Sequence, residues 1–272
     1  MKKKTIFTNK IVLFILIFLL IISIIVLINY NKELKLNKAK LSEVESEFNI
    51  QQGKVDELKN ELLEFTDKGI IRNEEKGYTY LSNVPAIDQF PDFPTGCESI
   101  ALLILLKSYG VEVDASDIIM LLPREERPYY KNGVRYGGNP ERGFLGDPTK
   151  YYGYGVYEKP IIEVANQFKP GIINATGKSL DDILKIIDTG NPVQVWVSMN
   201  LKKTSYSAYW IDEETGQTIN WPSDFHSLVI VGYSNERVIV SDPDTGTIRI
   251  FDKATFEKVY NFFGKRAIYY EN

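Results

Sequence analysis

The N-terminal part of the chain changes abruptly from charged to apolar. Four lysines, the first three consecutive, precede Ile11–Ile28, a run without a charged residue. A helix of roughly 20 apolar residues crosses the hydrocarbon core of a bilayer. A secretory signal has a shorter apolar part, of about 7 to 15 residues, before a small-residue cleavage site, and no such site follows Ile28. We therefore expect an uncleaved transmembrane signal anchor within residues 1–30.

The orientation of this anchor follows from its charges. Further lysines lie beyond the apolar run but are diluted by Glu33, whereas Lys2, Lys3 and Lys4 form a tight cluster at the extreme terminus. Such a cluster favours a cytoplasmic N-terminus. The expected location is the cell membrane, with a single pass and an extracellular C-terminal domain.

A second pattern follows the apolar run, with apolar residues at alternating steps of three and four. These positions are Leu34, Leu41, Val44, Phe48, Val55, Leu58, Leu62 and Phe65. This is a heptad pattern, and Asn37 and Gln51 occupy the remaining seam positions, where polar residues fix register at a cost in stability. We expect residues 31–68 to form a coiled-coil stalk that makes a homo-oligomer. The alternative is a solvated amphipathic helix that only holds the next domain away from the membrane.

The remaining residues, 69–272, are enough for one domain. Capping residues, among them Ser179 and Asp252, and apolar periodicity predict helices from Cys97 to about Tyr109, within Asp114–Pro123, and over 161–168, 179–191 and 253–263. Runs rich in β-branched residues predict strands over 192–199, 226–234, 237–243, 247–252 and 265–270, and the short polar turns between the middle three predict a meander. Helices followed by an antiparallel sheet indicate an α+β fold.

Residues 124–160 lack a clear period and are dense in glycine, proline and tyrosine. A long ordered loop in a compact domain is usually functional. We expect a loop here whose tyrosines line a groove.

Composition and charge narrow the functional classes. The chain is 44% hydrophobic with a net charge of −4, so it lacks the basic field that nucleic-acid binding requires. One cysteine and one histidine exclude an internal disulfide and a zinc site of the Cys/His type. We expect no cofactor and no nucleic-acid partner.

Cys97, the only cysteine, follows Thr95-Gly96 and begins the apolar helix. The first turn of a helix stabilises an anion, which lowers the pKa of a thiol placed there and makes it a nucleophile. The alternative is ordinary packing, because lone cysteines are among the most buried residues.

His226, the only histidine, opens a predicted strand, and Asp242 ends the next one. If the two strands pair antiparallel, the carboxylate of Asp242 comes within reach of His226 Nδ1, the orienting role in a catalytic triad. A thiol and an imidazole need to be close in space only. Asp244 competes with Asp242 for this role, but it lies in an Asp-Pro-Asp-Thr-Gly turn and is more simply a turn former. His226 could also be a strand-end histidine bonded to a nearby carbonyl.

Four segments together resemble a known family. "VPAIDQFPDFPTGCESIALLILLKSYG", "GNPERGFLGDP", "GNPVQVWV" and "HSLVIVGYSNERVIVSDPDTG" are similar to papain-like cysteine peptidases related to the bacterial double-glycine leader (bacteriocin-processing) peptidases. Glu98-Ser99 after the cysteine, in place of Gly-Pro, fits the stand-alone branch rather than the transporter-linked one. The resemblance implies that Cys97 attacks, His226 is general base and acid, Asp242 orients His226, and Gln89 helps form the oxyanion hole.

The resemblance implies a papain-like fold and a hydrolase that cleaves amide bonds in a peptide or protein substrate. Combined with the N-terminal patterns, it predicts a membrane-anchored cysteine peptidase that acts on envelope proteins or peptides. Two alternatives remain open. One is a non-catalytic binding module whose groove is the tyrosine-rich loop from Tyr129 to Tyr157, and the other is an acyl transferase that uses the same thiol.

Overall fold

The structure is a computed structural model that describes residues 27, 29–35, 37–42, 44–46, 48, 52–53, 69–73, 77–202 and 204–271. The chain divides into two compact units, residues 1–61 and 62–272.

In the first unit, the described residues are helical. No helix among the residues that the structure describes has the length and apolar character needed to cross a membrane. The predicted span Ile11–Ile28 lies outside the described residues, apart from Leu27, and so do residues 54–68 of the predicted stalk.

The second unit is built on a large sheet whose strand pairs are all antiparallel. Its main path runs through β1 (Ile70–Asn73), β2 (Tyr78–Leu81), β11 (Phe225–Ser234), β8 (Val193–Ser198), β14 (Ala267–Tyr270) and β7 (Ile172–Asn174). The remaining strands, β12 (Arg237–Asp242) and β13 (Thr247–Asp252), continue from β11. The predicted meander of three consecutive strands is therefore present as β11, β12 and β13.

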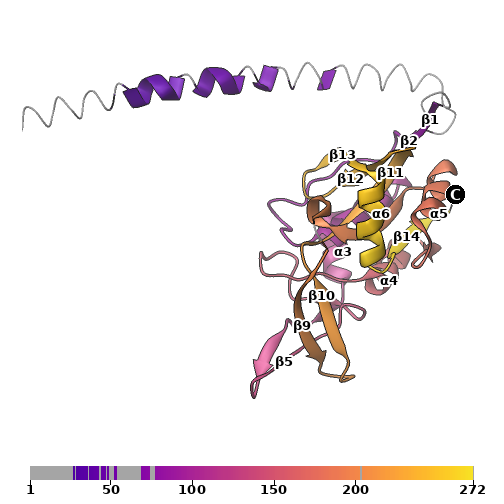
Figure 1. Cartoon of the computed structure of the whole chain (residues 1–272). Coiled ribbons are helices and arrows are strands. Elements are labelled where there is room, and N and C mark those ends of the chain that lie inside the picture. Colours follow the sequence, from indigo (N-terminus) through magenta and orange to yellow (C-terminus); the bar gives the residue numbers. More distant parts are fainter. Residues whose placement is uncertain are drawn as a thin grey trace, which may run out of the picture. The chain divides into compact units, whose positions relative to one another are not determined.

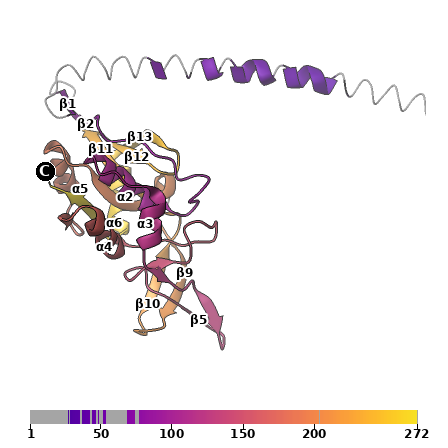
Figure 2. The same ribbon diagram turned by 180° about the vertical axis from the view of Figure 1, so that it is seen from behind.

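The described part of the second unit has five helices: α2 (Cys97–Ser108), α3 (Ala115–Leu121), α4 (Glu158–Phe168), α5 (Leu180–Asp188) and α6 (Lys253–Phe262). Four of them pack on the sheet, and α3 packs against α2 and α4. Opposite views show α6 in front of the sheet and α2 with α3 behind it (Figures 1 and 2). Two predicted caps are present, because the side chains of Ser179 and Asp252 accept hydrogen bonds from the backbone N–H groups of Asp182 and Thr255. Each of the five helices predicted for residues 69–272 matches a helix in the structure.

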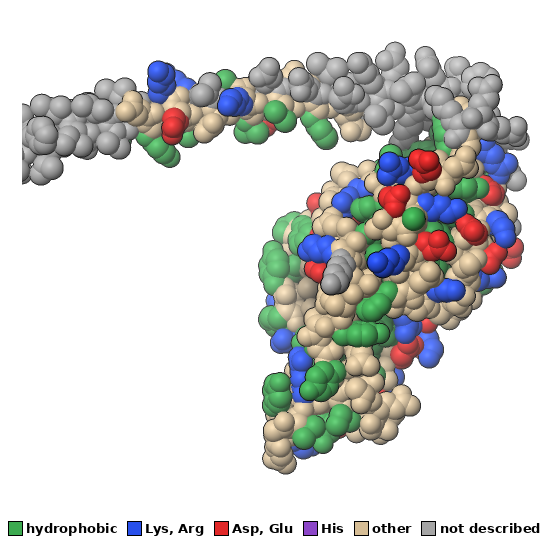
Figure 3. All heavy atoms as spheres, in the orientation of Figure 1, with side chains coloured by type: hydrophobic (Ala, Val, Ile, Leu, Met, Phe, Trp, Pro, Cys, Tyr) green, Lys and Arg blue, Asp and Glu red, His purple; other side chains and the backbone are tan. Residues whose placement is uncertain are grey.

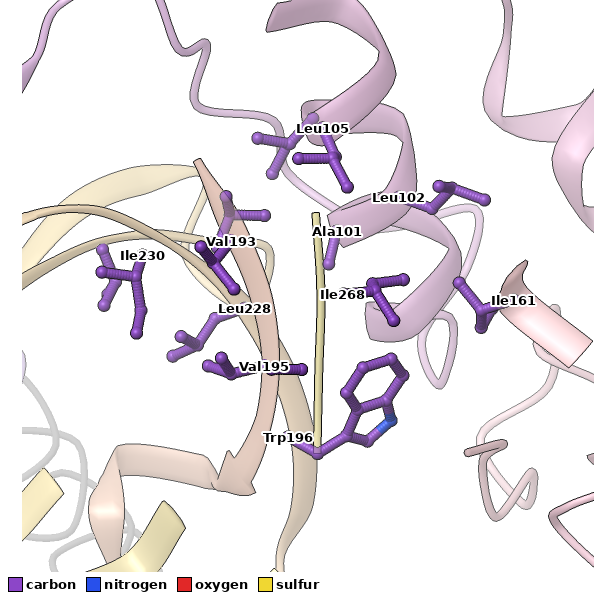
Figure 4. Packing of buried hydrophobic residues seen from close by; sticks show 14 of the residues in the cluster. Ala101, Leu102, Leu105, Ile161, Val193, Val195, Trp196, Leu228, Ile230 and Ile268 are labelled. Atoms are coloured by element: carbon purple, nitrogen blue, oxygen red, sulfur yellow. The ribbon is translucent and has the colours of Figure 1, made fainter. Parts of the chain in front are cut away.

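The core forms where α2 packs against the centre of the sheet. The first ten residues of α2 are all buried, which explains the lack of an amphipathic pattern in this helix. Ala101 and Leu105 of α2 lie near Val193 of β8, and Ile268 of β14 lies beside the same helix (Figure 4). This packing fixes the position of the N-terminus of α2, where Cys97 lies.

Residues 124–160 differ from the predicted loop. They contain four short strands: β3 (Arg124–Glu125), β4 (Tyr129–Lys131), β5 (Val134–Gly137) and β6 (Phe144–Leu145). β4 and β5 join β9 (Tyr206–Asp212) and β10 (Thr218–Pro222), which the sequence did not predict, in a second sheet of order β10-β9-β5-β4. We call this sheet the arm, because it projects from the domain (Figure 1).

A buried ion pair fastens the arm to the segment before α4. Arg142 donates to both carboxylate oxygens of Asp212 at 2.8 Å and also pairs with Glu125. The Asp212 side chain is completely buried.

Exposed apolar side chains gather at this end of the domain on the face drawn in Figure 3. The exposed tyrosines of the arm include Tyr130, Tyr206 and Tyr209.

The α+β class is confirmed, but the predicted order of helices first and sheet second is wrong, because strands also precede and separate the helices. β1 and β2 precede the first helix of the domain, and β2 pairs with β11 from the C-terminal half. The N-terminal strand β2 therefore lies in the sheet next to β11, the strand that carries His226.

Candidate active site

Cys97 is the first residue of α2, as its sequence context predicts. The turn before it is held by backbone bonds, since the N–H of Gly96 donates to the carbonyl of Phe93. A Cβ atom on Gly96 would lie 2.9 Å from the Cβ of Phe93, so this tight turn requires glycine. Thr95 also donates through Oγ1 to the carbonyl of Lys150 at 2.9 Å, which anchors the turn to a distant loop.

The thiol of Cys97 is buried and has two polar contacts. Its S–H donates to Oε2 of Glu98 at 3.3 Å, and the backbone N–H of Ser227 donates to the sulfur. Burial, followed by the charge of Glu98, raises the pKa of Cys97 well above its usual value. The predicted lowering of this pKa by the helix N-terminus is therefore wrong, because desolvation and a neighbouring carboxylate outweigh the helix dipole.

His226 is the second residue of β11 and is almost completely buried. β11 lies in the interior of the sheet, where it pairs with both β8 and β12. The Nε2 atom of His226 lies 2.7 Å from Oδ1 of Asp242. Asp242 ends β12, which pairs antiparallel with β11 as predicted.

The pairing nitrogen of His226 differs from the prediction. Asp242 contacts Nε2 rather than Nδ1, and Nδ1 is buried without a hydrogen-bond partner among the described residues. An orphaned buried nitrogen is costly unless another group uses it. Nδ1 is therefore the nitrogen of His226 that is free to exchange a proton.

Asp242 is held in place from two further directions. Arg249 of β13 donates to Oδ2 at 2.7 Å, and the backbone N–H of Asp244 donates to Oδ1 at 3.0 Å. Burial raises the pKa of Asp242, but the hydrogen bonds from His226 and Arg249 outweigh burial and lower the pKa overall. The carboxylate form is thus favoured, and Asp244 is part of the turn, as predicted.

Gln89 is buried, and its backbone N–H donates to the carbonyl of Pro243, next to Asp242. Its side-chain Nε2 donates to the carbonyl of Pro94 at 3.0 Å. An amide group has two N–H donors, so one remains for another acceptor. Oε1 of Gln89 has no partner in the described part of the chain.

Cys97, His226 and Gln89 line one pocket of about 260 Å³. One wall is aromatic and is formed by Tyr154, Trp221 and Phe225, with the Trp221 and Phe225 ring centroids 4.4 Å apart. Three of the four predicted site residues thus share a pocket, and Asp242 contacts the histidine of that pocket.

The sequence did not single out Arg249, Glu98 as a partner of the thiol, or the aromatic wall. Arg249 could have been found from the hairpin register, because Thr247 pairs with Asp242 and Arg249 lies two residues further on the same face. Glu98 could have been suspected as an acidic residue at the start of a buried helix.

One cysteine at a helix N-terminus, in a pocket shared with a histidine that is bonded to an aspartate, is the arrangement of a thiol hydrolase. The chain belongs to the Peptidase_C39 like family, whose sequence profile matches residues 81–268. The predicted family is thereby confirmed, and the predicted stand-alone branch is consistent with the matches.

Three other proteins are similar to this chain. The uncharacterized protein YvpB of Bacillus subtilis (strain 168) is 28% identical over 182 residues, which are 65% of this chain and 70% of YvpB. The crystal structure of a protein from Bacillus anthracis, described as a C39-like peptidase, aligns with a TM-score of 0.64 and 29% identity over 71% of this chain and 96% of that one. The peptidase domain of Streptococcus ComA, a bifunctional ABC transporter, is more distant, with 17% identity and a TM-score of 0.41 over 70% of this chain and 99% of that domain.

Proposed function

We propose that this protein is a cysteine peptidase in which Cys97 is the nucleophile, His226 the general base and acid, and Asp242 the group that orients His226. The observation that carries the proposal is the shared pocket of Cys97 and His226, with His226 Nε2 engaged by Asp242 and Nδ1 without a partner among the described residues. Family membership supports a peptidase of this class.

The first half of the reaction forms an acyl-enzyme. The S–H proton of Cys97 passes to Nδ1 of His226, and the thiolate attacks the carbonyl carbon of the substrate. The oxyanion accepts hydrogen bonds from the backbone N–H of Cys97 and from the second N–H of Gln89. The N–H of a first helical residue has no partner within its helix, so it is available for this role. The imidazolium then protonates the leaving amine, and the C–N bond breaks.

The second half of the reaction releases the acid. His226, neutral again, removes a proton from water, and the hydroxide adds to the thioester carbonyl. The C–S bond breaks, and the sulfur regains its proton from His226. The carboxylate of Asp242 stabilises the imidazolium in both halves and holds the ring with Nδ1 toward the pocket.

The peptidase is proposed to act outside the cell, anchored by residues 11–28. The support is the sequence of this run and the lysine cluster before it. A helical stalk of about 35 residues would extend some 50 Å from the membrane, at roughly 1.5 Å per residue. The substrates would then be envelope proteins or peptides.

The stalk is proposed to assemble two or three copies of the chain. Its described seam residues Leu34, Leu41, Val44 and Phe48 have exposed fractions of 41%, 59%, 61% and 64% in the single chain. Heptad seam residues are normally buried against partner helices. Partner helices from further copies would cover these side chains.

Activity is tested with the full chain in detergent, incubated with unfolded casein, and with mass spectrometry of the products. We expect new peptide termini with the wild-type protein and none with Cys97→Ala, which removes only the thiol. Identical product patterns for the two proteins would refute the peptidase proposal.

The anchor is tested by fractionation of cells that produce either the full chain or a chain without residues 1–30. We expect the full chain in the membrane fraction, released by detergent but not by salt or alkali, and the shortened chain in the soluble fraction. Recovery of the full chain as a cleaved, secreted form would contradict the anchor.

A non-catalytic binding module is the second candidate, favoured by one observation. The thiol of Cys97 is buried beside a carboxylate that raises its pKa, which opposes reactivity. A binding module would leave casein intact and yet retain peptides in the pocket. Cys97→Ala would not change that retention.

A further inference from the structure

Glu98 is a buried acid that the proposed mechanism does not use. Its side chain has no exposed surface, although glutamate is almost never fully buried unless it is paired. Within the described residues, no lysine or arginine forms an ion pair with it. Its two carboxyl oxygens are instead bound to the Cys97 thiol and to a backbone N–H.

The surroundings of Glu98 suit a carboxyl group, because each of its oxygens accepts a hydrogen bond. Oε1 accepts the N–H of Val156 at 2.8 Å, and Oε2 accepts the S–H of Cys97 at 3.3 Å. A Cβ atom on Gly155 would lie 2.5 Å from Oε1, so the glycine leaves the room that the carboxyl occupies. The Gln194 side chain also donates to the Glu98 carbonyl at 3.0 Å and fixes the start of α2.

We propose that Glu98 is a positioning residue that sets the protonation state of the nucleophile. As a carboxylate it accepts the S–H of Cys97 and holds the thiol form. As a carboxylic acid it donates to the sulfur and permits the thiolate. The inference rests on the proposed function, because it concerns the activation of Cys97.

The charges around Cys97 and Glu98 determine how the ionisation of one group affects the ionisation of the other. Cys97 on α2 and His226 on β11 are the titratable groups that act on Glu98, and Asp242 on β12 also acts on the thiol. The segment before α4 contributes only the backbone N–H of Val156. Two adjacent negative charges in a buried site repel each other, so Cys97 and Glu98 do not lose both protons readily.

The pair is therefore expected to titrate in two steps. Burial raises the pKa of Glu98 to about 7, so the first proton leaves the pair near neutral pH. The remaining proton is shared in a fixed ratio between sulfur and carboxyl, so the thiolate fraction stays level until a much higher pH. Without an acid at position 98 and with His226 replaced by alanine, Cys97 would titrate in one step.

The test is the rate at which iodoacetamide alkylates Cys97 in the full chain, measured against pH for the wild type and Glu98→Gln. Glutamine keeps an oxygen for the N–H of Val156 and cannot ionise. We expect the wild-type rate to rise to about pH 7, level off and rise again. Glu98→Gln should lose the level part that begins near pH 7 and should react there about tenfold faster than the wild type. Superimposable profiles would overturn the proposal.

Two controls separate this test from that of the proposed function. Glu125→Gln removes another carboxylate, one that pairs with Arg142, and should leave the alkylation profile unchanged. The comparison of the wild type with Glu98→Gln is repeated with His226→Ala added to both proteins. The difference should persist there if Glu98 acts on the thiol, even if the role of His226 as a base fails.

A second measurement avoids any Glu98 variant. The ultraviolet absorbance of the thiolate is taken as the difference between His226→Ala and the double variant His226→Ala with Cys97→Ser over the same pH range, so that no imidazole is coupled to the thiol. Two steps with a level region between them support the proposal even if Glu98→Gln does not fold. A single step would overturn it.

Discussion

The imidazole of His226 contacts the carboxylate of Asp242 through Nε2, at 2.7 Å, and both side chains are almost completely buried. Asp242 is in turn bound by Arg249 through its other oxygen. A carboxylate held in this way fixes both the tautomer and the orientation of a histidine ring. The contact also determines which nitrogen remains for the thiol.

Replacement of Asp242 by asparagine should disable His226. The variant keeps the shape of the side chain but loses the charge that stabilises the imidazolium. We expect kcat for casein cleavage to fall by about 10²- to 10⁴-fold. Circular dichroism should show an unchanged fold. The matched control is Asp244→Asn in the adjoining turn, which keeps the backbone N–H that donates to Asp242 and should keep activity within about twofold. Equal effects of the two substitutions would remove Asp242 from the triad.

Replacement of Gln89 by alanine should slow hydrolysis of the substrate but leave the reactivity of the Cys97 thiol unchanged. It removes an N–H donor to the oxyanion, which typically costs about 10²- to 10³-fold in kcat. Alkylation by iodoacetamide forms no oxyanion, so its rate should stay near that of the wild type. If hydrolysis survives unchanged in Gln89→Ala, the oxyanion role belongs to another donor.

The ion pair between Arg142 and Asp212 should contribute strongly to stability. Arg142→Met leaves the completely buried carboxylate of Asp212 without its main partner. We expect the free energy of unfolding in urea to fall by about 3 kcal/mol. Lys131→Met breaks an exposed pair with Glu213 in the same arm and should have no measurable effect.

The stability difference between wild type and Arg142→Met should also depend on pH. Hydrogen bonds from Arg142 lower the pKa of Asp212 in the folded protein. A lowered carboxyl pKa stabilises the fold above the unfolded pKa of about 4, and the contribution is lost as pH falls further. The difference should therefore shrink in acid, and a constant difference would argue against the ion pair as its source.

Substitution in the stalk tests assembly. Leu41→Asp places a charge at a predicted seam position, and Lys40→Asp places the same charge beside the seam. We expect sedimentation of the full chain in detergent to give a dimer or trimer for the wild type and for Lys40→Asp, and a monomer for Leu41→Asp. A monomeric wild type would favour the solvated spacer.

The sequence predicted the parts of the fold that local signals determine. Ser179 and Asp252 mark the starts of α5 and α6, and the apolar runs at β11, β12 and β13 identify the meander. It did not predict β9 and β10, whose exposed tyrosines and polar residues give no apolar alternation. β9 pairs with β5, a partner that is distant in sequence.

The site was predictable to a similar extent. Cys97, His226, Asp242 and Gln89 were identified from order, spacing and resemblance. The histidine nitrogen that Asp242 contacts depends on ring orientation, which spacing does not determine. The raised pKa of Cys97 depends on its burial and on the direction of the Glu98 side chain, both of which result from tertiary packing.

The most direct test of the central claim is the dependence of Cys97 alkylation on His226. The chain has one cysteine, so the mass gained from iodoacetamide reports that thiol alone. If His226 takes the proton of Cys97, His226→Ala should slow alkylation of the full chain at neutral pH by at least about tenfold, because the thiolate loses its partner. Equal rates for the wild type and His226→Ala would contradict the thiol–imidazole pair.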